Sequence, residues 1–451
     1  MTIPSKYAQR YIYHFTHIDN LPFILKNGFL AKNHPQFPVE NSKSIAASSI
    51  QERRSTMLVT CGQGKVVHDY VPFYFGSLSP MLLGVVNKKN IDQSDILYFE
   101  FPISLLERTG AVFTDASANA NILPNFYSDL TSLDELNWLE IDSIKWGSAD
   151  DTLKRARMAE GLLPSSVELT AASRVVVWDQ TVKVKVEKIV REAGAIFPPI
   201  YLESSARRHY FTKIAPPSGR RETLVTGPKG VASAYNQACE KILQSGPRYE
   251  ARFKNPNALL IELRRNFSCL PHTAELVGLK SENGVHKKTV DMHTLEVVQN
   301  LLNLDEFNDL TDIEQGRTEL AAFLHDIGKG PKARWVKNGG LQKVDPDHPV
   351  SAMPMMVEIF LEHIQISTAE SAKAILKLVC YHDLFGEVLG KERDEQQIVN
   401  AVSNVSELKM LYALGKADAT ALNPTWWNDD LAHDLFHRCE SAIVDKMSIT
   451  E

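Results

Sequence analysis

Three residues that lie far apart in the chain, a histidine, an arginine and a glutamate, could together act on a dinucleotide. His14 lies in a strand-like run over 12–15, Arg54 closes the cluster Gln-Glu-Arg-Arg, and Glu160 follows a basic segment. A carboxylate can hydrogen-bond a ribose and take a proton from a nucleophile, while a guanidinium pairs two pyrophosphate oxygens at once. This combination suits a pocket that breaks the nicotinamide–ribose bond of NAD. Arg53 is the alternative candidate to Arg54.

The spacing of these three residues is not diagnostic by itself. His14 could reach a ribose hydroxyl from the edge of a strand, but polar residues of all three types also serve ordinary surface needs. Both interpretations stay open at this point.

Histidines and aspartates in the second half form a possible metal centre. His293 begins an apolar-periodic helix, His325 and Asp326 end another, and Asp418 lies inside a later one. Imidazole and carboxylate ligands together suit a divalent cation such as Mn, Fe, Ni or Mg that activates water. Two further histidines are candidates for a second cation, although lone histidines on helices more often have no such role. They are His348 and His382.

Basic residues near Glu160 and near the end of the first half could follow a nucleic-acid backbone. A solvated helix or strand face is an equally good interpretation of such runs. The candidates are Lys154, Arg155, Arg157, Arg207 and Arg208.

The elements that must position these residues differ between the two halves. Residues 1–213 alternate short β-rich runs with helical stretches, one of them expected over 151–162, and predict a mixed α/β domain. Residues 214–230 are rich in Pro, Gly and Arg and predict a linker or exposed loop within a bridge over 214–284. Helical periodicity then dominates 285–451. The predicted fold class is therefore α+β, with a mixed α/β domain followed by an all-α domain.

Composition limits the class of protein. The 451 residues carry a net charge of −6, which argues against a globally basic nucleic-acid binder but not against a local basic groove. The five cysteines include no CxxC pair, so we expect neither a zinc finger nor a disulfide framework. No apolar run is long enough for a membrane span, and we expect a cytoplasmic protein.

A series of blocks in the first half occurs in a recognisable order. It begins with Tyr-His-Phe-Thr-His-Ile-Asp-Asn-Leu at 13–21 and Ile-Gln-Glu-Arg-Arg at 50–54. It continues with His-Asp-Tyr-Val-Pro-Phe-Tyr-Phe at 68–75, Arg-Met-Ala-Glu at 157–160 and His-Tyr-Phe at 209–211. Over about residues 7–213 these blocks resemble the DarT toxins, which are DNA ADP-ribosyltransferases.

The resemblance implies roles for individual residues. His14 would contact NAD, Arg54 would activate the substrate, and Glu160 would be the catalytic glutamate. The dinucleotide pocket would also be lined by Thr16, Asn20, Tyr74 and Met81. The implied acceptor is a base of single-stranded DNA, and an antitoxin is a candidate partner.

The run Phe-Leu-His-Asp-Ile-Gly-Lys at 323–329 is close to the signature of the HD phosphohydrolases. Over about residues 270–440 the chain resembles this superfamily, most of all the HD regions appended to nucleotidyltransferases. The resemblance implies a cation held by His293, His325, Asp326 and Asp418. His348 and the pair His382-Asp383 fall where binuclear members place extra histidines.

Together these features predict a toxin or phage-defence enzyme that uses NAD to modify a nucleobase, with an HD domain that processes the product. An alternative keeps the transferase but gives it RNA or protein as acceptor, with the HD domain as a regulatory or antitoxin-like module.

Overall fold

The computed structural model describes residues 2–38, 43–45, 48–62, 64–118, 123–144, 150–203, 208–215, 219–246, 250–282, 288–391 and 393–450. The chain divides into two units, Met1–Leu224 and Val225–Glu451. Each unit is described by itself.

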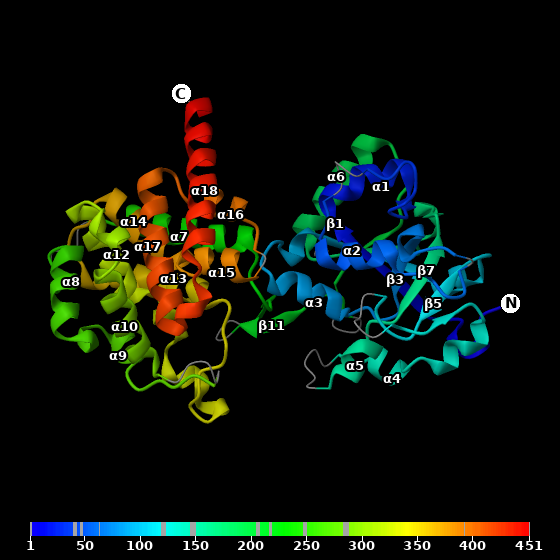
Figure 1. The fold of residues 1–451 in the computed structure, drawn as a ribbon, viewed down its shortest axis with the longest axis horizontal. Helices are drawn as coiled ribbons and strands as arrows, with labels where there is room; N and C mark the ends of the chain where they lie inside the picture. Colours follow the sequence, from blue (N-terminus) through cyan, green and yellow to red (C-terminus); the bar gives the residue numbers. More distant parts are fainter. Residues whose placement is uncertain are drawn as a thin grey trace. The chain divides into compact units, whose positions relative to one another are not determined.

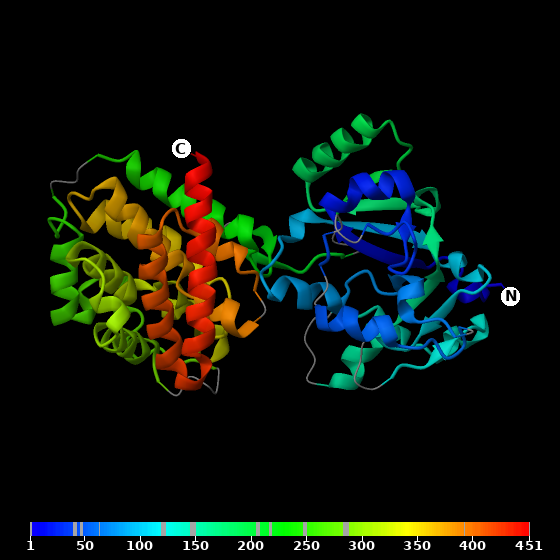
Figure 2. The same cartoon turned by 45° about the horizontal axis from the view of Figure 1, so that its top comes forward.

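An eight-stranded sheet is the centre of the first unit, with the strand order β10-β9-β4-β1-β3-β7-β5-β6 (Figures 1 and 2). All its neighbouring strands are antiparallel except β10 and β9, which are parallel. The strands are β1 (Tyr11–His17), β3 (Tyr70–Tyr74), β4 (Ile96–Pro102), β5 (Val112–Thr114), β6 (Phe126–Tyr127), β7 (Glu160–Pro164), β9 (Arg174–Val177) and β10 (Ile200–Leu202).

Strands outside this sheet form two small pairs. Strand β2 (Phe29–Leu30) pairs with β8 (Ser166–Val167), and β11 (Thr212–Ala215) pairs with β12 (Arg220–Thr223).

Helices cover both faces of the large sheet. On one face α1 (Leu21–Asn27) and α6 (Gln180–Ala193) share a core with buried residues of β1, β3 and β4. On the other face α3 (Pro80–Asn87) packs on the opposite side chains of β1 and β4. Six successive residues of β4 are buried, which a strand covered on both faces requires. Three short helices complete the unit: α2 (Ser48–Thr56), α4 (Trp138–Ile141) and α5 (Asp151–Ala156).

The structure corrects two sequence-based expectations in this unit. The helix expected over 151–162 ends at Ala156, and Glu160 begins strand β7 instead. Pairing of β7 with both β3 and β5 outweighs the local helical preference of the segment. The expected loop at 214–230 includes the end of β11 and all of β12, which pair with each other.

The second unit is helical, which together with the mixed first unit confirms the predicted α+β class. Its helices are α7 (Pro228–Leu243), α8 (Pro256–Arg265), α9 (Pro271–Ala274), α10 (Val290–Leu302), α11 (Asp305–Asn308), α12 (Asp312–Leu324), α13 (His348–Glu358), α14 (Ala369–Tyr381), α15 (Leu384–Lys391), α16 (Gln396–Ala401), α17 (Val405–Leu422) and α18 (Asp429–Thr450).

One hydrophobic core unites these helices, and it includes Val231 of α7 and Leu259 of α8. Part of the segment expected as a bridge, 214–284, thus shares its core with the helices that follow. The domain boundaries at 213 and 284 remain predictions. Among the described residues, no helix has both the length and the apolar character needed to cross a membrane.

Candidate active site and metal centre

A cavity of about 230 Å³ lies in the first unit, at the place where the pairing between strands β1 and β3 ends. The two strands are paired at Tyr13 and Tyr74, whereas β1 pairs with β4 along its whole length. All six residues expected to contact NAD line this cavity, which we call the dinucleotide cavity. They are His14, Thr16, Asn20, Arg54, Tyr74 and Met81.

Arg54, which lines this cavity, forms a bidentate ion pair with Glu160, which is fully buried and is not among the lining residues. Nη1 of Arg54 donates to Oε1 of Glu160 at 3.0 Å, and Nη2 donates to Oε2 at 2.9 Å. Both side chains are buried, and Glu160 stands opposite Tyr74 in the β3–β7 ladder. Burial lowers the pKa of Arg54, but the Glu160 carboxylate outweighs it and the pKa is raised. The arginine therefore carries a fixed positive charge at the cavity.

A second set of donors holds the Glu160 carboxylate from the other side. The backbone N–H of Ala118 and the hydroxyl of Ser117 donate to Oε1 at 3.2 and 3.4 Å. The backbone N–H of Glu160 donates to the hydroxyl of Thr114 at 3.2 Å. Sequence analysis missed Ser117 and Ala118, because one acts through its backbone and the other is an unremarkable serine.

The side chain of His14 reaches from β1 to β3, and a hydrogen bond there holds it in one orientation. Its Nδ1 lies 2.9 Å from the carbonyl oxygen of Pro72, which can only accept, so Nδ1 carries the proton. Burial lowers the pKa of His14, and the ring is neutral at physiological pH. Its Nε2 is therefore an acceptor, which suits a ribose hydroxyl.

Two further residues, the cationic Lys32 and the histidine His68, line the dinucleotide cavity and were not expected there from the sequence. Burial, together with the charges of Lys32 and Arg54, lowers the pKa of His68 to about 4, so this ring is neutral. The positive potential that suppresses a proton on His68 favours a polyanion such as a pyrophosphate.

Asn20 fixes the segment that closes one side of the cavity. Its Nδ2 donates to the hydroxyl of Thr16 at 2.9 Å and to the carbonyl of Lys43 at 3.1 Å. Its Oδ1 accepts from the Lys43 backbone at 2.8 Å. Asn20 thus positions Thr16 and the 43–45 segment as well as lining the cavity.

The five candidate nucleic-acid residues have different surroundings. Lys154 is exposed on α5 and Arg155 is half-buried. Arg157 is buried, and its guanidinium is bound by Glu140 and Ser143 of the same unit. Arg208 is half-buried and donates to the hydroxyl of Thr212, and Arg207 lies outside the described residues.

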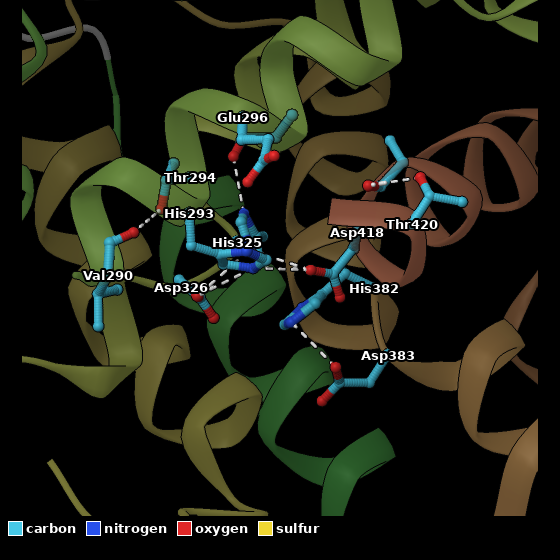
Figure 3. A network of polar contacts seen from close by, with 12 residues as sticks. Val290, His293, Thr294, Glu296, His325, Asp326, His382, Asp383, Asp418 and Thr420 are labelled. Carbon is cyan, nitrogen blue, oxygen red and sulfur yellow. Dashed lines mark hydrogen bonds and ion pairs between the residues drawn. The ribbon is translucent and has the colours of Figure 1, made fainter. Parts of the chain in front are cut away.

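The second unit brings the predicted metal ligands to one point (Figure 3). They come from five helices: His293 from α10, His325 and Asp326 from the end of α12, His348 from the start of α13, His382 from the end of α14, and Asp418 from α17. Nε2 of His293 lies 2.9 Å from Oδ1 of Asp418, and Nε2 of His325 lies 3.4 Å from Oδ2 of Asp326. We call His293, His325, Asp326 and Asp418 the first metal site.

The residues present fit a divalent cation. Nε2 of His325 and Oδ1 of Asp326 are fully buried but have no hydrogen-bond partner, which is costly unless another group binds them. Burial lowers the pKa of His325, but Asp326 and then Asp418 outweigh it and raise the pKa to about 9. The carboxylates thus create a strongly negative potential, which attracts a cation.

Two residues beside this site were not expected as metal ligands from the sequence. Nζ of Lys329 lies 2.7 Å from Oδ2 of Asp326 and is almost buried, so this lysine belongs to the centre. Asp383 lies within the same group of donor atoms as His348 and His382. The signal in the sequence was the repeated His-Asp pair, at 325–326 and again at 382–383.

Comparison with known proteins gives separate matches for the two halves. Residues 13–211 match the family described as "ssDNA thymidine ADP-ribosyltransferase, DarT", and residues 290–410 match the HD domain. A DNA ADP-ribosyl transferase of Thermus sp. is 34% identical over 186 residues, covering 40% of this chain and 87% of the relative.

Two further similarities concern one half of the chain each. A bifunctional uridylyltransferase/uridylyl-removing enzyme of Psychrobacter sp. is 33% identical over 175 residues, and the match spans 35% of this chain but 18% of that enzyme. The structure titled "Thermus sp. 2.9 DarT in complex with ADP-ribosylated ssDNA" aligns at 32% identity with a TM-score of 0.40. It covers 45% of this chain and 97% of the other.

Proposed function

This chain belongs to the DarT family of ADP-ribosyltransferases, and we propose that its first unit transfers ADP-ribose from NAD to a base of single-stranded DNA. The observation that carries the proposal is a cavity lined by all six residues expected to contact NAD, one of which, Arg54, is paired with the buried Glu160. Relatives named DNA ADP-ribosyl transferase support DNA as the acceptor.

In this proposal the cavity residues divide the work of binding NAD. Nε2 of His14 accepts a hydrogen bond from a ribose hydroxyl, because Nδ1 is already used on Pro72. Arg54 pairs with pyrophosphate oxygens through guanidinium N–H groups other than those bonded to Glu160, helped by the positive charge of Lys32. Thr16 and Asn20 hold the wall of the cavity in place.

Glu160 provides the negative charge that the reaction needs. As the bond between nicotinamide nitrogen and ribose C1′ breaks, positive charge develops on the ribose, and a nearby carboxylate stabilises it. The electron pair of the broken bond leaves with nicotinamide, which becomes neutral. A ring nitrogen of the acceptor base bonds to C1′ and releases its proton to Glu160.

Labelled NAD incubated in parallel with single-stranded DNA, RNA and protein tests the acceptor. We expect label on DNA, with the mass of one ADP-ribosyl group per modified base, and release of nicotinamide. Glu160→Gln should lower kcat by about 10²- to 10⁴-fold, the usual range for a lost general base. The exposed Glu168→Gln is the matched control. Label on RNA or protein instead would replace DNA as acceptor, and full activity of Glu160→Gln would remove the mechanism.

For the second unit we propose a metal-dependent phosphohydrolase. Its support is the convergence of buried histidines and aspartates in a region that matches the HD domain. A divalent cation held by the first metal site would polarise a phosphate ester and lower the pKa of a water molecule. Lys329 holds Asp326 in position and places a positive charge beside any phosphate that enters.

The substrate proposed for this unit is the product of the first. Attached ADP-ribose contains a pyrophosphate, so one chain could add the group and then trim it. Full-length protein and its Asp326→Asn variant should give the same initial DNA adduct, and the unaltered chain alone should then shorten it. Adducts that stay intact in both would refute the coupling and favour a regulatory, antitoxin-like role. That role predicts greater toxicity of a variant with a disrupted second unit.

A further inference from the structure

Helix α18 carries two exposed histidines one turn apart, His433 and His437 (Figure 1). Their Nε2 atoms lie 2.9 Å from each other, and the two ring planes are almost perpendicular, at 89°. We propose that these two imidazoles, oriented by Glu440, bind a divalent transition-metal cation on the outside of the second unit. This site depends on neither of the activities proposed above.

Glu440 determines which nitrogen of His437 can bind a cation. Nδ1 of His437 lies 3.2 Å from Oε2 of Glu440, and because a carboxylate can only accept, Nδ1 carries the proton. In the neutral ring Nε2 then has a lone pair, and this atom faces His433. A carboxylate on the far ring nitrogen is the usual support of a histidine that binds a metal.

The distance between the two Nε2 atoms indicates the kind of cation. Imidazole nitrogens bind first-row cations at about 2.1 Å. Two such bonds place the nitrogens about 3.0 Å apart at a right angle and about 3.4 Å apart at a tetrahedral angle. The observed 2.9 Å fits the right angle, which is typical of Ni²⁺ and Cu²⁺. The side chain of His437 is 54% exposed, so water can supply the remaining ligands.

The opposite face of α18 holds the two histidines in place. Leu435 and Cys439 are buried in the core of the second unit, and the helix contacts α16 and α17. The ring of Phe436 packs edge-on against that of His437, with 5.7 Å between their centres. Side chains four residues apart on an ordered helix are already neighbours, so little freedom is lost on binding. A cation would join two successive turns of α18.

The local charge favours a cation at this position. Residues 429–440 include four carboxylates and one basic side chain, Arg438. Nη2 of Arg438 donates to Oε2 of Glu395 at 2.9 Å, so a carboxylate outside this segment balances its charge. The remaining negative potential attracts a divalent cation to the two ring nitrogens.

Titration of the full-length chain with Cu²⁺ after chelation tests the proposal, followed by elemental analysis and electron paramagnetic resonance. His433→Gln combined with His437→Gln should bind one cation fewer than wild type and lose the signal of copper held by two imidazole nitrogens. His325→Gln, in the first metal site, should lose a different cation and keep this signal. Glu440→Gln should weaken the site about 10-fold, as the loss of a supporting carboxylate usually does. Titration with Ni²⁺ should give the same order of variants.

Asp434→Gln combined with Arg438→Gln is the matched control, because both residues are exposed and have the same spacing on the same helix. It should bind as wild type does. Ser441→His combined with His433→Gln restores the four-residue spacing to His437 and should restore the cation. Circular dichroism checks the helix content of each variant.

Two outcomes would overturn the proposal. One is an equal number of cations in wild type and in the variant that lacks both histidines, which would leave the pair as an ordinary hydrogen bond between rings. The other is loss of the cation in the matched control as well. The titration needs no substrate, so its result holds whether or not either unit is active.

Discussion

The guanidinium of Arg54 contacts both carboxylate oxygens of Glu160, at 3.0 and 2.9 Å, although the two residues are 106 positions apart. Helix α2 supplies the arginine and the first residue of β7 supplies the glutamate. A buried pair of this kind is costly to break, because removal of one partner leaves an uncompensated charge. Breaking the pair should therefore disturb both α2 and β7, and with them the charge of Arg54 at the dinucleotide cavity.

Arg54→Lys should weaken NAD binding while the first unit keeps its fold. Lysine keeps the positive charge but loses the planar fork that pairs two oxygens, so we expect KM for NAD to rise about 10-fold or more, or about 1.4 kcal/mol. Steady-state kinetics at saturating DNA measure this. Arg53→Lys, next to it and exposed, is the control. A larger effect of the Arg53 variant would make Arg53 the substrate-binding arginine.

Ser117→Ala should lower turnover modestly. The hydroxyl of Ser117 makes one of the bonds that orient Glu160, and at 3.4 Å it is a long one. The loss of a single such bond costs about 0.5–1.5 kcal/mol, or roughly 2- to 10-fold in kcat. Ser117→Thr keeps the hydroxyl and should restore most of the rate. Equal kinetics of the Ala variant and wild type would show that Ala118 and Arg54 suffice to hold the carboxylate.

His209 makes the stability of the first unit depend on pH. Its two ring nitrogens contact Glu203 at 3.0 Å and Glu100 at 3.1 Å in a buried setting. Burial lowers the pKa of His209, but its bonds to Glu100 and Glu203 outweigh this and raise it above the ordinary value of about 6.5. This stabilisation is fully present below pH of about 6.5 and is lost as pH rises through the folded-state pKa.

Denaturant unfolding at a series of pH values should show this loss in the free energy of unfolding of the first unit. His209→Gln should be less stable than wild type at pH of about 6 and should lose less stability above it. His34→Gln is the control, because Nδ1 of this histidine accepts a hydrogen bond from the backbone N–H of Gln36 instead. A wild-type profile that rises across this range would contradict the assignment.

Residue chemistry and local periodicity can be predicted from the sequence, whereas contacts between distant segments cannot. His14, Arg54 and Glu160 could be named as candidates because their residue types carry chemistry, and the central strands could be predicted because β-rich runs mark them. The helix expected across Glu160 was wrong, because the partners of β7 lie on β3 and β5, far away in the chain. No local pattern reports such pairing.

The same limit applies within the two sites. The donor from Ala118 is a backbone N–H, which any residue supplies, so the sequence carries no signal for it. Lys32 and His68 become part of the dinucleotide cavity through folding alone. At the metal centre the histidines and aspartates were predictable as a set, whereas the position of Asp383 beside them depends on where α13 and α14 place His348 and His382.

Divalent cation should stabilise the second unit, because its buried donors are assembled only in the folded state. Mn²⁺ at about 100 times its dissociation constant should add about 2.7 kcal/mol to the free energy of unfolding of this unit. Thermal melts followed by helical circular dichroism, with and without chelator, measure the effect. Asp326→Asn should abolish most of it, since the carboxylate of Asp326 faces both His325 and His348. The exposed Asp309→Asn should leave the shift intact. If the two variants respond alike, Asp326 does not bind the cation.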